Sequence, residues 1–289
     1  MYRASQGSLS EIGNVSQRVV RNLPDGTFEL SDLKTILLTH GPNWPTMTLV
    51  CVENTHTMMG GRAVSVEWME NLGTLCHEYG IPIHLDGARL INASAALGTS
   101  PMRLTQHCSS ATFCLNKGLG APGGCVITGN SDFIERATLV RKSLGGVIHQ
   151  AGVLAAACIY GLNNFVSRIS KDHSNARSIA KAICAVNSSA VTVDVSSVQT
   201  NVVHMICDNI RVNPDQLCSR MGRVFENEAL DLSEGVVVKC SPIQPNIVRI
   251  MTHGDLLMED VRAVIRKLQF VIAEYDNCFL IEYDVTETC

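Results

Sequence analysis

Short apolar runs alternate with segments of helical period along most of this chain. The runs with a strand pattern are Thr48–Val52, Ile83–Leu85, Ala111–Leu115, Cys125–Thr128, Val191–Val195, Val202–Cys207, Val236–Lys239 and Val248–Met251. Strands that alternate with helices are typical of βα units. We therefore predict an α/β fold with a mostly parallel sheet, and we expect the first four strands to belong to one unit.

Between and after these runs, apolar residues recur at the three- and four-residue spacings of amphipathic helices. The predicted helices are Ser65–Tyr79, Ser131–Leu144 with Ser131 as N-cap, Gln150–Ile169, His173–Val186, Asn213–Glu226 and Met258–Glu274. From about Asn187 the strands become shorter, which indicates a smaller α+β part. We expect a large domain over residues 1–185 and a small C-terminal subdomain over residues 186–289.

Composition narrows the class of protein. The 289 residues are 46% hydrophobic, which is enough for a sizeable core, and the formal net charge is −4 with both signs mixed along the chain. Such a balance gives no reason to expect a nucleic acid or an anionic membrane as partner, so a small-molecule ligand is favoured. The N-terminal residues lack the apolar region of a secretory signal, and no apolar run has the length of a membrane span. We expect a cytoplasmic protein.

The twelve cysteines are scattered, without a C-x-x-C pair, and several lie inside apolar runs. Val50-Cys51-Val52 and Ala157-Cys158-Ile159 are examples. This distribution favours reduced core cysteines over a disulfide framework or a metal site.

Asp86 and Lys117 each come just after a predicted strand. If these strands are parallel, both side chains lie at the carboxyl edge of the sheet, where open α/β sheets bind ligands. Asp86 could pair with the ring nitrogen of a pyridoxal cofactor, or it could cap the following turn. Lys117 could be the amine that bonds to such a cofactor, or an ordinary surface lysine.

The loop after Lys117 is Gly118-Leu119-Gly120-Ala121-Pro122-Gly123-Gly124, which lets a cofactor approach the backbone closely. It also matches the dinucleotide pattern G-x-G-x-x-G. That pattern must open a helix, whereas Gly124 here leads into the predicted strand Cys125–Thr128. The pattern is therefore a weak indication of a dinucleotide site.

Three more residues have side chains suited to substrate chemistry. His56 follows a predicted strand and has a pKa suited to proton transfer, although a surface-loop histidine is the alternative. Arg89 could contact cofactor or substrate oxygen atoms, or pair with Asp86. Arg249, in a late strand, could bind a carboxylate through two hydrogen bonds or form a surface ion pair.

These motifs together resemble one family, the pyridoxal phosphate-dependent threonine aldolases of the fold-type I aminotransferase-like superfamily. The resemblance extends from about the N-terminus to Phe270. It rests on Glu53 to His56, Gly60-Gly61-Arg62, His84 to Arg89, Cys114 to Pro122, Arg141-Lys142, Leu144 to Gly146, Gln150 to Ala157, and Arg249 to His253.

The resemblance implies a retro-aldol cleavage of L-threonine or L-allo-threonine to glycine and acetaldehyde, with pyridoxal 5′-phosphate as cofactor. It implies that Lys117 holds the cofactor, that Asp86 pairs with its ring nitrogen, and that Arg89 and Arg249 orient the substrate carboxylate. His56 matches the residue near the β-hydroxyl. Lys142 matches a lysine near the substrate. A homo-oligomer, a dimer or tetramer, is also implied.

The sequence differs from the family pattern at three places. Family members begin upstream with a serine-glycine-threonine turn that binds the cofactor phosphate and a histidine that stacks on the ring, and Met1 here follows both. Asn116 replaces the usual serine, and Ile148-His149 replaces a methionine-arginine. Because a helix N-terminus is a strong anion site, these differences predict a weaker grip on the phosphate. They also keep open a second hypothesis, a catalytically impaired or non-catalytic partner of a complete threonine aldolase.

Overall fold

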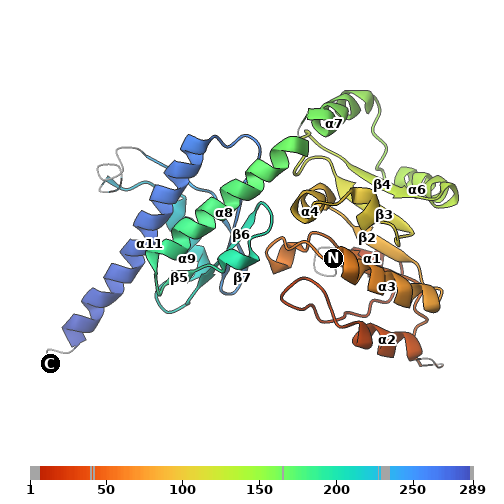
Figure 1. Ribbon diagram of the computed structural model, residues 1–289, viewed down its shortest axis with the longest axis horizontal. Coiled ribbons are helices and arrows are strands. Elements are labelled where there is room, and N and C mark those ends of the chain that lie inside the picture. The colour runs from red at the N-terminus through yellow and green to blue at the C-terminus, as the bar shows by residue number, and fades with distance from the viewer. Residues whose placement is uncertain are drawn as a thin grey trace. The chain divides into compact units, whose positions relative to one another are not determined.

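The structure is a computed structural model that describes residues 7–39, 41, 43–164, 166–226, 228 and 235–286, with side chains described as far as residue 277. The chain divides into two compact units, Met1–Ser167 and Arg168–Cys289 (Figure 1). Helix α8, Ile169–Val186, lies before the domain boundary expected from the sequence, and it belongs to the second unit.

The first unit contains a four-stranded sheet made of the four strands that the apolar runs predict. The strands are β1 (Val50–Glu53), β2 (Ile83–Asp86), β3 (Ser110–Cys114) and β4 (Cys125–Gly129). They lie in the order β1-β2-β3-β4. The first three are parallel, and β4 is antiparallel to β3. The carboxyl ends of β1, β2 and β3 therefore share one edge, as predicted.

Alternating apolar residues of this sheet face the core of the first unit. Val52 and Leu85 are buried with Leu72 of α3. Helix α3 begins where the sequence predicts, because the Ser65 side chain accepts a hydrogen bond from the amide of Trp68. The helices of this unit are α1 (Ser8–Glu11), α2 (Leu30–Leu38), η1 (Thr57–Met59), α3 (Val66–Glu78), α4 (Leu90–Leu97), α5 (Pro101–Leu104), α6 (Ser131–Ser143) and α7 (Gly152–Asn164).

The second unit has an antiparallel sheet in the order β5-β6-β8-β7. Its helices α8 and α11 pack against each other and bury apolar residues in one core with β6 and β8 (Figure 1). The remaining elements are β5 (Val191–Thr192), η3 (Val195–Ser197), β6 (Val202–Cys207), α9 (Pro214–Met221), β7 (Ser241–Gln244), β8 (Ile247–Met251) and α11 (Met258–Thr286). The short helix η2, Val166–Arg168, spans the division between the units.

Four local predictions need correction. The strand predicted at Val236–Lys239 is wrong, because those residues are irregular and β7 begins only at Ser241. The long helix predicted over Gln150–Ile169 is also wrong: α7 ends at Asn164 and α8 begins at Ile169. The N-cap of α6 is Asn130, whose side chain accepts from the amide of Phe133 at 2.9 Å, rather than Ser131.

The fourth correction concerns α9, which ends at Met221 and not at Glu226. Its start is as predicted, with Pro214 in the first turn and a capping box between Asn213 and Gln216. Among the residues whose structure is described, no helix combines the length and the apolar character that a bilayer crossing requires.

Candidate active site

The carboxyl edge of the parallel strands gathers the loops that contain three predicted site residues. Glu53 lies beside Asp86 in the β1–β2 register, and Asp86 lies beside Thr112 of β3. The amide of Asn54 donates to the carbonyl oxygen of Asp86 at 3.0 Å. His56 follows β1 by three residues, Asp86 ends β2, and Lys117 follows β3 by three residues. The topology therefore brings these three loops to one edge.

Asp86 is held by its own turn. Its side-chain Oδ1 accepts a hydrogen bond from the amide of Ala88 at 3.1 Å. This contact matches the capping role that the sequence left open, and the side chain remains partly exposed. A carboxylate oriented in this way by a backbone amide can accept a further hydrogen bond from a ligand, since each carboxylate oxygen has two lone pairs.

Lys117 is exposed at the tip of a loop that apolar side chains anchor. Leu115, Leu119 and Ala121 are buried in one cluster. The amide of Gly120 donates to the carbonyl oxygen of Lys117 at 2.9 Å, and Gly120 has a φ of 65°, a left-handed conformation that favours glycine. The loop then leads into β4, which removes the structural context that a dinucleotide fingerprint requires.

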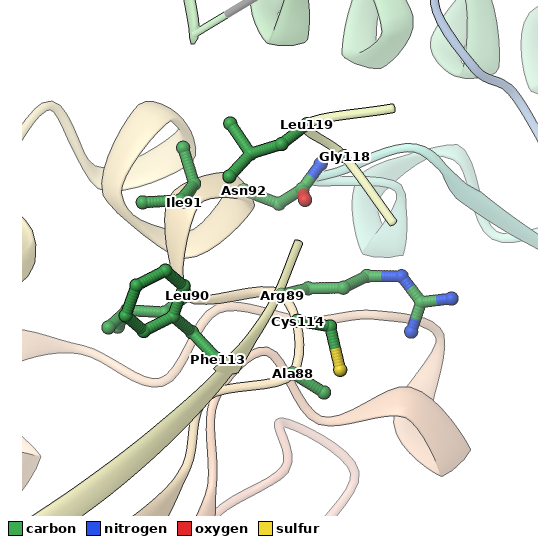
Figure 2. A pocket seen from close by; sticks show the side chains of 9 residues that line it. All are labelled: Ala88, Arg89, Leu90, Ile91, Asn92, Phe113, Cys114, Gly118 and Leu119. Carbon is green, nitrogen blue, oxygen red and sulfur yellow. The ribbon is translucent and has the colours of Figure 1, made fainter. Parts of the chain in front are cut away.

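Arg89 leaves the end of β2 and is buried, with 9% of its surface exposed. Its Nη1 donates to Oγ1 of Thr57 at 3.1 Å. Figure 2 shows the side chain extending away from Leu90 and Phe113, which line the same small pocket. The guanidinium is thus aimed at the loop after β1, where His56 lies.

Thr57 also ties this loop to β1. Its amide donates to Oε1 of Glu53 at 2.9 Å. Burial raises the pKa of Glu53, but the hydrogen bonds from the backbone and side chain of Thr57 and the charge of His56 lower it below its usual value. Glu53 is therefore an ionised carboxylate at neutral pH, and Thr57 connects it to Arg89. Nothing in the sequence pattern marks Thr57, because a threonine in a loop has no distinctive signal.

His56 is buried, with 7% of its surface exposed, and its Nδ1 has no hydrogen-bond partner among the described residues. Burial lowers the pKa of His56, and the Glu53 carboxylate offsets only part of that effect. The imidazole is accordingly neutral at neutral pH. A neutral ring with a free nitrogen can accept a proton.

The pocket beside Arg89 is lined by residues of α4 and of the loop around β3. These are Ala88, Arg89, Leu90, Ile91, Asn92, Phe113, Cys114, Gly118 and Leu119. The Asn92 side chain points toward Gly118 in Figure 2, and a Cβ on Gly118 would lie only 2.6 Å from its Oδ1. Gly118 is needed there because the loop that carries Lys117 passes directly over Asn92, a residue that the sequence analysis did not single out.

Lys142 and Arg249 lie on other elements. Lys142 is exposed in the last turn of α6. Arg249 belongs to the second unit, in the middle of β8, and pairs in register with His204 of β6. Its Nε is buried without a hydrogen-bond partner among the described residues, as is Nε2 of His204. Burial, together with the charge of Arg249, lowers the pKa of His204 to about 4.

The residues at the sheet edge fit pyridoxal phosphate. The donor set consists of an amine, a carboxylate and a guanidinium, and His56 has a buried ring nitrogen without a partner among the residues described. An acid for the ring nitrogen and an amine for the aldehyde carbon are the two groups that this cofactor requires from a protein.

Comparison with known proteins agrees with this fit. The family model described as Beta-eliminating lyase matches residues 1–208. The low-specificity L-threonine aldolase 1 of Arabidopsis thaliana is 35% identical over 258 residues, which are 88% of this chain and 68% of that protein. Among solved structures, a Leishmania major threonine aldolase superposes with a TM-score of 0.68 at 17% identity, covering 93% of this chain and 76% of that one.

A more distant structure shows the same fold. A serine palmitoyltransferase from S. paucimobilis with bound PLP superposes with a TM-score of 0.59 at 15% identity, covering 86% of this chain and 60% of that chain. The fold is thus that of the fold-type I pyridoxal phosphate-dependent proteins. Within this class, the chain belongs to the threonine aldolase family of beta-eliminating lyases.

Proposed function

We propose that this chain cleaves L-threonine or L-allo-threonine to glycine and acetaldehyde by retro-aldol chemistry. The observation that carries the proposal is the common edge of β1, β2 and β3, which gathers the loops bearing His56, Asp86 and Lys117. Family membership supports the reaction class. The substrate preference is part of the proposal.

In this proposal the cofactor is held by two residues of neighbouring strand ends. Lys117 would bond to pyridoxal 5′-phosphate through its amine, and Asp86 would accept a hydrogen bond from the ring nitrogen and keep it protonated. The bound cofactor would supply an electron sink for the pair released when the Cα–Cβ bond breaks. The hydrogen bond from Ala88 supports the role of Asp86, because it fixes the carboxylate at the strand end.

His56 is proposed as the base at the substrate β-hydroxyl. Its buried, neutral imidazole is suited to accepting that proton, and its free Nδ1 is the atom we assign to the transfer. Deprotonating the hydroxyl allows its oxygen to become the carbonyl oxygen of acetaldehyde as the carbon–carbon bond breaks.

Arg89 and Arg249 are proposed to bind the substrate carboxylate, and Lys142 is proposed to lie near the substrate. Arg89 is oriented for this by its hydrogen bond to Thr57. Guanidinium groups suit the task because they offer paired N–H donors to a carboxylate. The first unit would thus provide the cofactor-binding part, and the second unit would be the smaller subdomain that provides Arg249.

A homo-oligomer is also proposed. Large apolar side chains are exposed on neighbouring elements of the first unit, which supports burial against a second copy. They include Ile127, Leu139, Val140, Leu144, Val153, Ile159 and Tyr160. Light scattering of the purified chain tests this, and a monomer at all concentrations would contradict it.

The activity is tested by incubating the chain with pyridoxal phosphate and each threonine diastereomer. Acetaldehyde is measured through its reduction by alcohol dehydrogenase. We expect release from at least one diastereomer, and we expect His56→Gln to lower kcat by about 100-fold or more while exposed His77, changed to Gln as a control, has no effect. Cofactor binding without any acetaldehyde would contradict the proposed reaction.

A further inference from the structure

Two cysteine side chains of the second unit are in direct contact. Sγ of Cys240 donates a hydrogen bond to Sγ of Cys218 at 3.5 Å. Cys218 lies in α9, and Cys240 immediately precedes β7. Both side chains are partly exposed, so a small oxidant has access to them.

The backbone around the two thiols is fixed on both sides. The amide of Val238 donates to the carbonyl oxygen of Met221 at 3.0 Å, which ties the segment before β7 to the end of α9. On the other side, Ser241 pairs with Arg249 in the β7–β8 ladder. Both cysteines pack against the buried core of the unit. Their proximity is therefore a property of the fold rather than of two loose side chains.

We propose that Cys218 and Cys240 are a redox-responsive pair that forms a disulfide under oxidising conditions. A disulfide has a sulfur–sulfur bond of about 2.05 Å, so the sulfurs need to approach by about 1.5 Å, which is within reach of side-chain rotation. The sequence predicts reduced core cysteines, and this pair is the place where that resting state can change.

The two thiols have unequal roles. Burial raises the pKa of both. The S–H of Cys240 lowers the pKa of Cys218 in part, whereas donating that hydrogen bond raises the pKa of Cys240 further. Cys218 is the more readily ionised thiol and hence the one that attacks first. Cys240 then completes the bond.

With a hydroperoxide as oxidant the reaction balances as follows. The Cys218 sulfur attacks one oxygen of hydrogen peroxide, the O–O bond breaks, and a sulfenic acid and one water form. The Cys240 sulfur then attacks the Cys218 sulfur, expelling its hydroxyl as a second water. Two thiols are oxidised by two electrons in total, and one peroxide is reduced to two waters.

The competing neighbour is Cys207 of β6. Its charge raises the pKa of Cys240, so it lies in the same cluster, but it is buried, with 2% of its surface exposed. We expect it to stay reduced because the oxidant reaches it least. Cys184, which is exposed on α8, is a matched control for general surface oxidation.

The test uses the full chain treated with hydrogen peroxide and digested without reduction. Mass spectrometry is expected to show a peptide joined through Cys218 and Cys240 and lighter by two hydrogens. The bond closes a separation of 22 residues, so we expect the melting temperature to rise by roughly 5–10 °C and to return on adding dithiothreitol.

Variants separate this pair from the other thiols. C218S and C240S should each abolish the cross-link and the thermal shift, whereas C184S and C207S should keep both. C240S should leave a Cys218 sulfenic acid that dimedone labels. A cross-link through Cys207 or Cys184, or no cross-link while Cys184 is oxidised in the unaltered chain, would overturn the proposal without depending on any variant.

Discussion

The guanidinium of Arg89, at the end of β2, donates a hydrogen bond to the hydroxyl of Thr57, in the loop after β1, at 3.1 Å. Two loops of the carboxyl edge are joined by this contact. Because Thr57 also bonds to Glu53 through its amide, Arg89 is held in a chain of polar contacts that begins on the sheet.

Thr57→Val should disturb this chain while preserving the shape of the side chain. We expect a loss of about 1–2 kcal/mol in the free energy of unfolding, because the partners of the hydroxyl are then left without it, and a KM for threonine raised severalfold. Urea denaturation and steady-state kinetics measure the two effects.

Thr55→Val is the matched control. The Thr55 hydroxyl is buried and has no hydrogen-bond partner among the described residues, so its removal should be neutral or slightly stabilising. Equal losses from the two threonine variants would show that the contact with Arg89 contributes nothing specific.

Gly118→Ala should destabilise the chain, because its Cβ would lie 2.6 Å from Oδ1 of Asn92, which is 1% exposed and cannot move easily. Overpacking of this kind costs about 1–3 kcal/mol. The control is Gly123→Ala in the same loop, where a Cβ would meet nothing within 4 Å. We expect that control to change stability by less than about 0.5 kcal/mol. Indistinguishable denaturation midpoints for the two variants would refute the close approach of this loop to α4.

His173 should make stability depend on pH. Burial, with the nearby charge of Arg177, lowers the pKa of His173 from 6.5 to about 4. Between these values the unfolded chain binds a proton that the folded chain does not, so stability is fully present above pH 6.5 and falls as the pH decreases toward 4. At pH 5 the loss from this residue amounts to about 2 kcal/mol.

His173→Gln removes this titration. Unfolding free energies measured at pH 7.5 and pH 5 should differ less in this variant than in the unaltered chain, by about 2 kcal/mol. His77→Gln, at an exposed position of α3, should leave the difference unchanged. An unchanged pH dependence in His173→Gln would mean that the residue is protonated in the folded state as well.

Much of the fold follows from local patterns, and the misses have local causes. The parallel strands are predictable because their apolar residues fill both the core and the alternation of the sheet, as at Ile83 and Leu85. Strand β7 was missed because Ser241 and Pro242 give no strand signal, and only pairing with β8 makes that segment extended. The apolar residues from Val236 to Val238 fit a strand, but the described structure gives them no ladder partner and Val238 is buried beside α9 instead.

The candidate site divides in the same way. His56, Asp86 and Lys117 could be placed at one edge because each follows an apolar run and the rule for parallel sheets does the rest. Thr57 and Asn92 could not be found, since their significance lies in contacts with Arg89 and Gly118 across 32 and 26 positions of the chain. The pairing of His204 with Arg249 likewise depends on strand register, which the sequence pattern does not fix.

The central claim is that Lys117 bonds to the cofactor, and trapping that bond tests it most directly. The chain is incubated with pyridoxal phosphate, reduced with borohydride and digested, and the modified peptide is identified by mass spectrometry. We predict a single major adduct on Lys117, lost in Lys117→Ala and retained in Lys34→Ala, a change at an exposed lysine of α2 in the same unit. Labelling spread over exposed lysines, or unchanged labelling in Lys117→Ala, would contradict the account.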